Sequence, residues 1–133
     1  MNALFADTFY FLALLHEDDA AHPRALALSG TRSNPILTTL WVLTEVADAL
    51  SAPNLRTNFL PLLQALRTDP ACTIVPPSEE LFDQGVELYA GRADKEWTLT
   101  DCISFEVMRR YGVTEALTGD RHFEQAGFAA LLK

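Results

Sequence analysis

The chain has little cysteine and no long uninterrupted apolar run. Its two cysteines, Cys72 and Cys102, lie far apart, with no Cys-x-x-Cys spacing and no neighbouring histidine, so they form neither a zinc pattern nor a disulfide framework. The apolar stretch from Leu4 to Leu15 contains Asp7 and is too short to span a bilayer. We therefore expect reduced cysteines in the core and a soluble, cytoplasmic protein.

Basic residues are also scarce, because 10 Lys and Arg stand against 18 Asp and Glu, for a formal net charge of −8. Proteins that bind duplex nucleic acid usually present a basic surface, so this composition argues against broad electrostatic binding of nucleic acid. If several of the acids are metal ligands, this repulsion of nucleic acid is reduced locally, since a bound divalent cation inverts the local field that a phosphate would feel.

Internal repeats, low-complexity runs and Gly/Ser linkers are absent from the sequence. With 133 residues and an apolar share of 49%, the chain can bury most of its apolar surface around one core. We therefore expect a single domain over residues 1–133.

Apolar periodicity, punctuated by Gly and Pro, predicts strands that alternate with helices. The strands are expected at residues 2–6, 35–38, 72–75, 113–118 and 128–132. Helices are expected after Asp7-Thr8, from Ala20 or Pro23 to Ser29, over 40–49, from Leu55 or Thr57 to Leu66, over 79–90, over 100–111, and as a turn at 121–126. Gly30 is expected to end the second of these helices. Leu81, Val86, Leu88 and Tyr89 supply the apolar surface of the helix over 79–90. This order predicts an α/β fold, in which a parallel sheet of four or five short strands carries helices on both faces.

Two acids follow directly on predicted strands, Asp7 on the first and Asp120 on the fourth. In an open parallel sheet, ligands bind at the carboxyl ends of the strands, where the strand order reverses. Carboxylates brought together there repel one another unless a cation neutralises them, and hard oxygen ligands select magnesium or manganese. Such ions support phosphodiester hydrolysis, which is the chemistry of metal-dependent nucleases.

Each acid also has a simpler explanation. Asp7 and Asp120 would serve as N-caps of the helices that follow, and Asp101 would favour the N-terminus of its helix. Glu45 falls on the polar side of the 40–50 helix beside Asp48, which is typical of a solvated carboxylate. Taken singly, none of these acids identifies a site.

As a set, the acids lie in four motifs: Ala6-Asp7-Thr8 before an aromatic-apolar helix, Leu43-Thr44-Glu45-Val46, Leu99-Thr100-Asp101-Cys102-Ile103-Ser104-Phe105 and Leu117-Thr118-Gly119-Asp120-Arg121-His122-Phe123. These motifs resemble those of the PIN-domain family, including its VapC-like toxin ribonucleases. Their order, spacing and the chain length all agree, and the resemblance covers essentially the whole chain.

The resemblance implies a PIN-like three-layer fold and a Mg²⁺- or Mn²⁺-dependent endoribonuclease that cleaves single-stranded RNA, such as tRNA or mRNA. Four acids would form its site, with two supporting threonines: Asp7, Glu45, Asp101, Asp120, Thr8 and Thr118. Asp7 and Asp101 would bind metal directly, Glu45 directly or through water, and Asp120 would complete a second, weaker position. Metal would activate the attacking water, and the products would be a 5′-phosphate and a 3′-hydroxyl.

Family members of this length commonly act as the toxin of a type II toxin–antitoxin pair, so the resemblance also implies a small antitoxin partner and a homodimer. Alternatives are an RNA-processing nuclease without an antitoxin and a catalytically silent, metal-binding interaction or signalling module. A phosphoryl receiver is disfavoured, because the strand at 73–75, taken as the middle strand, leads into Pro76-Pro77, and the only late lysine is Lys133. A D-x-D phosphatase fails, because Asp7 is followed by Thr8-Phe9.

Other reactive residues are weaker candidates. His122 beside Asp120 suggests acid–base catalysis, and Cys102 beside Asp101 suggests a nucleophile, but neither has a visible partner arrangement in the sequence. Asp94 would be a fifth acid but is expected to be exposed.

Aromatic and basic residues give no clear RNA-binding pattern. Trp41 and Trp97 could stack on bases, although packing is the favoured interpretation of both. Only Arg92, Lys95 and Arg121 lie close to the motifs, and each is expected to be an ordinary surface charge.

Overall fold

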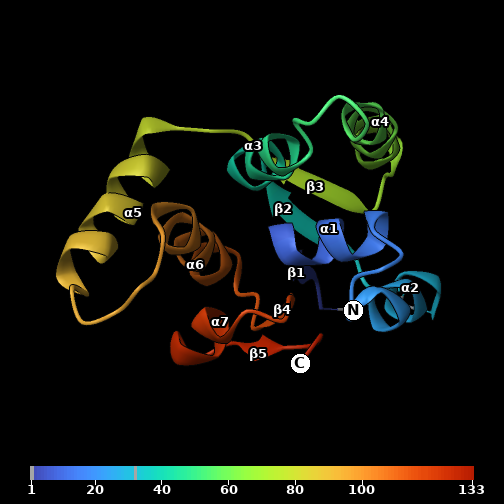
Figure 1. The fold of residues 1–133 in the computed structure, drawn as a ribbon. Helices are drawn as coiled ribbons and strands as arrows, with labels where there is room; N and C mark the ends of the chain where they lie inside the picture. The colour runs from blue at the N-terminus through green and yellow to red at the C-terminus, as the bar shows by residue number, and fades with distance from the viewer. Residues whose placement is uncertain (1, 32) are drawn as a thin grey trace.

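The computed structural model describes residues 2–31 and 33–133, which form five strands, seven α-helices and one short 3₁₀ helix (Figure 1). The strands are β1 (Leu4–Ala6), β2 (Ile36–Thr39), β3 (Cys72–Val75), β4 (Glu115–Leu117) and β5 (Ala129–Ala130). The helices are α1 (Thr8–Leu15), α2 (His22–Thr31), α3 (Leu40–Ala49), η1 (Arg56–Asn58), α4 (Phe59–Thr68), α5 (Glu79–Gly91), α6 (Leu99–Tyr111) and α7 (Arg121–Gln125). In the described part of the chain, no helix has both the length and the apolar character needed to cross a membrane.

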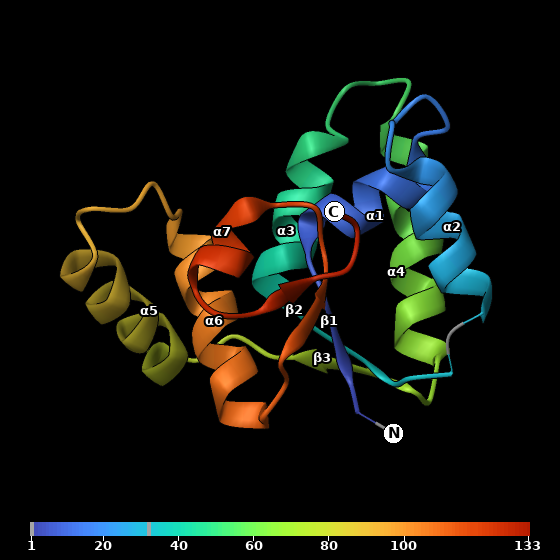
Figure 2. The same cartoon turned by 90° about the horizontal axis from the view of Figure 1, so that it is seen from below.

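All strands pair in parallel in one sheet of order β3-β2-β1-β4-β5, which confirms the predicted α/β class. In Figure 2 the strands lie between α2 and α4 on one side and α5 and α6 on the other, so the fold has three layers. The chain moves outward from β1 to β2 and β3, then returns to β4 on the opposite side of β1. The strand order therefore reverses between β1 and β4, and a binding crevice is expected at their carboxyl ends.

Three aromatic rings pack together where α6 and α7 lie beside β1. Phe105 of α6 meets Phe123 of α7 edge-on, with ring centroids 5.0 Å apart, and Phe123 also packs against Phe5 of β1. All three rings are fully buried. This aromatic cluster fixes the beginning of α7 relative to α6, and both helices contribute to the site described below.

Several element boundaries differ from the sequence prediction. Strands β4 and β5 are shorter than predicted, since residues 113–114 and 131–132 lie outside them. Gly30 does not end α2, which continues to Thr31, because a glycine inside a helix costs only about 1 kcal/mol. The predicted helix at 55–66 is instead η1 followed by α4, and Pro61 falls in the first turn of α4, where a missing N–H has no helical partner to lose.

Two further expectations are wrong at the level of packing. Strand β3, taken as the middle strand, lies at the edge of the sheet. Val86 and Tyr89 are exposed rather than packed, because α5 packs mainly on α6, through a close approach of Gly85 to Ile103. Leu81 is buried as expected.

Candidate active site

A cavity of about 250 Å³ lies at the carboxyl edge of the sheet, at the predicted reversal point. Its walls include all four predicted acids and three further polar residues: Asp7, Glu45, Asp101, Asp120, Thr8, Thr98 and His122. Four segments distant in sequence therefore meet at one place. Among the described residues that line this cavity, none is Lys or Arg.

Asp7 follows β1 and is the most deeply buried of the acids, with 5% of its surface exposed. It occupies the N-cap position of α1, but its side chain makes no capping hydrogen bond, so the simple capping explanation is wrong. Instead, Thr118 Oγ1 donates to Asp7 Oδ2 at 2.9 Å. Burial raises the pKa of Asp7 to about 7, the charges of Asp101 and Glu45 add to the increase, and the Thr118 hydrogen bond opposes it.

Glu45 lies on α3 and points to the same cavity. Its Oε1 accepts a hydrogen bond from Thr8 Oγ1, and its side chain is half-buried. Helix α3 begins directly at the end of β2, where the Thr39 side chain caps it by accepting from the Val42 N–H. Glu45 is therefore a held carboxylate rather than a freely solvated one.

Asp101 combines a structural and a site role at the beginning of α6. Its backbone N–H donates to Thr98 Oγ1 at 3.0 Å, and its Oδ2 accepts from the Thr98 N–H at 3.1 Å, which is a capping box. Burial is the main cause that raises the pKa of Asp101, while the hydrogen bond with His122 opposes the shift.

Asp120 caps α7, as the simpler explanation predicts, because its Oδ1 accepts from the His122 N–H at 2.9 Å. Its own N–H donates to Thr118 Oγ1 at 3.1 Å. The Thr118 hydroxyl thus joins Asp120 to Asp7. Gly119 lies between Thr118 and Asp120 in the chain and leaves no room for a side chain, since a Cβ there would lie 2.5 Å from Phe9 Cζ.

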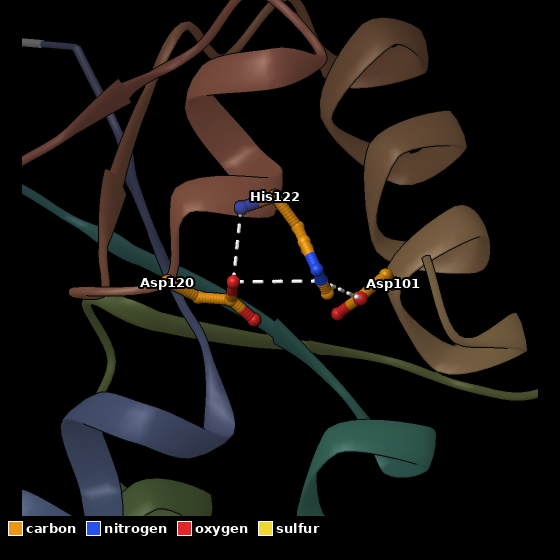
Figure 3. A group of neighbouring side chains, drawn as sticks. All are labelled: Asp101, Asp120 and His122. Carbon is orange, nitrogen blue, oxygen red and sulfur yellow. Dashed lines mark hydrogen bonds and ion pairs between the residues drawn. The ribbon is translucent and has the colours of Figure 1, made fainter. Parts of the chain in front are cut away.

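His122, a weak candidate on sequence grounds, lies at the site. Figure 3 shows its ring between Asp101 and Asp120: Nδ1 lies 2.9 Å from Asp101 Oδ2 and 3.5 Å from Asp120 Oδ1. His122 therefore has two acidic partners in the fold that the sequence around it does not reveal. The available signal was its place two residues after a predicted N-cap aspartate, but its approach to Asp101 depends on tertiary packing.

This donor set fits a divalent cation. One ligand atom each of Asp101, Asp120 and His122 lies within 4.8 Å of the other two, and Asp7 and Glu45 complete the acidic walls. Carboxylate oxygens are the ligands that Mg²⁺ and Mn²⁺ prefer. The raised pKa of Asp7 reflects a buried charge that the lining residues do not neutralise, and a bound cation would neutralise it.

The remaining candidates do not contribute to this cavity. Burial raises the pKa of the Cys102 thiol to about 11, so it stays protonated at neutral pH and is a poor nucleophile. Trp97 is buried, and its Nε1 donates to Gln125 Oε1 at 3.0 Å, which confirms packing rather than base stacking. Asp94 is exposed and paired with Arg92 at 3.0 Å, as expected of a surface acid.

Comparison with known proteins gives one family and close structural agreement. The family model described as "PIN domain" matches residues 4–129. The 23S rRNA-specific endonuclease VapC20 of Mycobacterium tuberculosis is 28% identical over 127 residues, which cover 94% of this chain and 95% of the relative.

Solved structures agree. The crystal structure of M. tuberculosis VapC20, described as a sarcin-ricin loop cleaving toxin, superposes with a TM-score of 0.86 at 27% identity, over 95% of this chain and 96% of that one. FitAcB from Neisseria gonorrhoeae gives a TM-score of 0.65 at 17% identity, over 96% of this chain and 94% of that one, which indicates a shared fold.

Proposed function

The chain belongs to the PIN-domain family, and on this premise we propose that it is an endoribonuclease that depends on a divalent metal ion. The observation that carries the proposal is the meeting of Asp7, Glu45, Asp101 and Asp120 around one cavity whose described lining contains no Lys or Arg. The similarity to VapC20, which is named as an endonuclease, supports the same chemistry.

In this proposal, Asp7 and Asp101 bind Mg²⁺ or Mn²⁺ directly, Glu45 binds directly or through water, and Asp120 completes a second, weaker position. When bound, the metal lowers the pKa of a water molecule and stabilises negative charge on the phosphodiester. The chain supplies fixed carboxylates, which reduces the reorganisation needed when substrate binds.

Hydroxyl groups hold these carboxylates in place. Thr118 donates to Asp7 and Thr8 donates to Glu45, so two of the acids have oriented oxygens. The Thr98 capping box orients Asp101. We propose Thr8 and Thr118 as supporting residues on these contacts, since groups that orient metal ligands typically change affinity or activity 10- to 100-fold when removed.

We propose RNA as the substrate, with cleavage that leaves a 5′-phosphate and a 3′-hydroxyl. VapC20 is named as specific for 23S rRNA, so ribosomal RNA is the first substrate to test, with tRNA and mRNA as comparisons. We further propose that the chain is the toxin of a pair with a small antitoxin, and that it forms a homodimer; mass measurement of the purified protein, alone and with the product of the adjacent gene, tests both.

The decisive experiment incubates the protein with these RNAs and Mn²⁺ or Mg²⁺, with a chelator control, beside Asp101→Asn. This change is nearly isosteric and keeps an acceptor for the Thr98 N–H, so it removes charge rather than the helix cap. An exposed acid on α3, changed as Asp48→Asn, is the matched control.

We expect cleavage by the wild type and by Asp48→Asn, and none by the chelated sample or by Asp101→Asn. If a folded wild type that binds Mn²⁺ cuts none of the RNAs, the catalytic proposal fails and a silent interaction module takes its place.

A further inference from the structure

A groove leads from the acid cavity along the segment that joins α5 to α6. Its larger part, about 850 Å³, is bounded by Tyr89, Arg92, Lys95 and Trp97, and reaches the acid cavity at Thr98. Its smaller part, about 310 Å³, shares Lys95 with the larger part and His122 with the acid cavity. These two adjoining depressions are lined by residues between 89 and 99 and by Arg121, His122 and Gln125, and we call them together the loop groove.

The charge of the loop groove differs from that of the whole chain. Three bases and two acids line it, which gives a formal charge of +1: Arg92, Lys95, Arg121, Asp94 and Glu96. The chain carries −8, and the adjacent acid cavity has no Lys or Arg in its described lining. A polyanion that reaches the cavity along this groove thus meets a more favourable local charge than in the cavity itself.

The three bases are not equivalent. Arg92 is held by two hydrogen bonds to Asp94, each 3.0 Å, and lies 5.1 Å from the centre of the Trp97 ring, so it shapes the segment. Lys95 is 3.9 Å from Asp94, and Arg121 is 3.5 Å from Glu96. Exposed pairs of this kind are worth about 1 kcal/mol or less, so both cations can exchange their partners for phosphates.

An exposed aromatic ring stands at the far end of the groove. Tyr89 lies in the last turns of α5 with 54% of its surface exposed, whereas Trp97 beneath the groove is buried. Proteins that bind single strands combine a basic groove with an aromatic ring on which a base stacks. Tyr89, Lys95 and Arg121 supply both parts, next to the cavity where cleavage is proposed.

We infer that the loop groove binds the single strand of RNA that flanks the cleaved bond, with a base stacked on Tyr89 and phosphates bound by Lys95 and Arg121. The inference rests on the proposed function and adds the path of the substrate. Its alternative is a protein interface, because Phe82, Val86 and Tyr89 form an exposed apolar stripe along α5.

The test measures binding separately from cleavage. Asp7→Asn serves as the parent, since Asp7 lines the acid cavity and not the groove. Anisotropy of a fluorescein-labelled single-stranded RNA gives the affinity of Tyr89→Ala and Tyr89→Phe in this parent. The matched control is Tyr111→Ala, a tyrosine of similar exposure (50%) at the opposite end of α6 from the cavity.

We expect Tyr89→Ala to weaken binding about 5-fold or more, while Tyr89→Phe and Tyr111→Ala bind like the parent. For the phosphate contact, Lys95→Gln should lower the slope of log Kd against log salt concentration by about 0.7. The other lysine of the chain, Lys133, pairs with Glu124 at 2.7 Å, and Lys133→Gln should leave the slope unchanged.

Affinities of Tyr89→Ala and Lys95→Gln within twofold of the parent would overturn the inference, and so would a parent that binds no RNA. If Tyr89→Ala changes the mass measured by sedimentation but not the affinity, the α5 stripe is a protein interface and the inference is again wrong. In each case cleavage by the wild type decides the proposed function independently, since that assay does not involve these variants.

Discussion

The acid cavity has two halves that are built differently. In the inner half, Asp7 and Glu45 are held by threonine hydroxyls, and Asp7 caps no helix. In the outer half, Asp101 and Asp120 cap α6 and α7. An acid that caps a helix stabilises the fold as well as the site, whereas a buried acid without that role costs free energy unless a cation neutralises it. The two halves should therefore respond differently to the same kind of substitution.

The largest effect should come from Asp7→Asn. We expect cleavage to fall more than about 100-fold, since a proposed ligand should matter at least as much as the groups that orient it. Stability should change in the opposite direction. The pKa of Asp7 is raised from the usual 3.8 to about 7, so the folded protein holds this proton more tightly than the unfolded chain does. The resulting contribution to stability is complete below about pH 4 and is lost as the pH rises to about 7.

At pH 8 with chelator, Asp7→Asn should therefore be more stable than the wild type, by up to about 4 kcal/mol, and the gain should vanish near pH 4. Urea unfolding at both pH values measures this difference. Added Mn²⁺ should stabilise the wild type and not the variant. A variant that is less stable than the wild type at pH 8 would contradict the free-energy cost assigned to the buried, ionised Asp7.

Thr118→Val tests the hydroxyl that links the two halves. The loss of its hydrogen bond should raise the pKa of Asp7 further, because that bond now opposes the increase. Deprotonation, and with it Mn²⁺ binding, should then require a higher pH, and cleavage should fall about 10- to 100-fold. Mn²⁺ titration by electron paramagnetic resonance at several pH values measures the shift; Thr118→Ser keeps the hydroxyl and should behave like the wild type.

Asp120 allows the structural and chemical roles of the outer half to be separated. Asp120→Ala should destabilise the fold by about 1 kcal/mol through loss of the α7 cap, whereas Asp120→Asn should not, since asparagine caps as well as aspartate. Both should reduce cleavage, because both remove the charge. Equal stability of the two variants in urea unfolding would show that the cap contributes little.

The four acids also differ in how far the sequence could predict them. Asp7 follows β1 directly and Asp120 lies three residues after the end of β4, so the hydrophobic periodicity of the chain and the rule for parallel sheets place both at one edge. Asp101 and Glu45 lie on helices, where periodicity alone says only that they are polar, and the motif resemblance was needed to include them. Local pattern thus predicts one acid of each half, and the other acid of each half is identified by the motif resemblance.

Features that depend on how helices and strands pack on one another could not be predicted from the local sequence pattern. The exposure of Tyr89 follows from α5 packing mainly on α6, which no periodicity within α5 reveals. Strands β4 and β5 pair at only two positions, Glu115 with Ala129 and Ala116 with Ala130. The extent of such pairing depends on the neighbouring strand, which the local sequence pattern does not reveal. Phe123 of α7 packs on Phe105 of α6, and this contact between the two helices holds His122 beside Asp101.

The smallest expected effect concerns His122, which joins the two acids of the outer half. Its Nδ1 hydrogen bonds with Asp101 Oδ2, and an asparagine can place an amide N–H near the same position. We expect His122→Leu to weaken Mn²⁺ binding about 10-fold and His122→Asn to retain most of it, measured by calorimetry. An equal loss in both variants would indicate that the imidazole is itself a ligand. No loss in either would mean that backbone caps alone hold the outer carboxylates, so that the two halves differ even more than their contacts suggest.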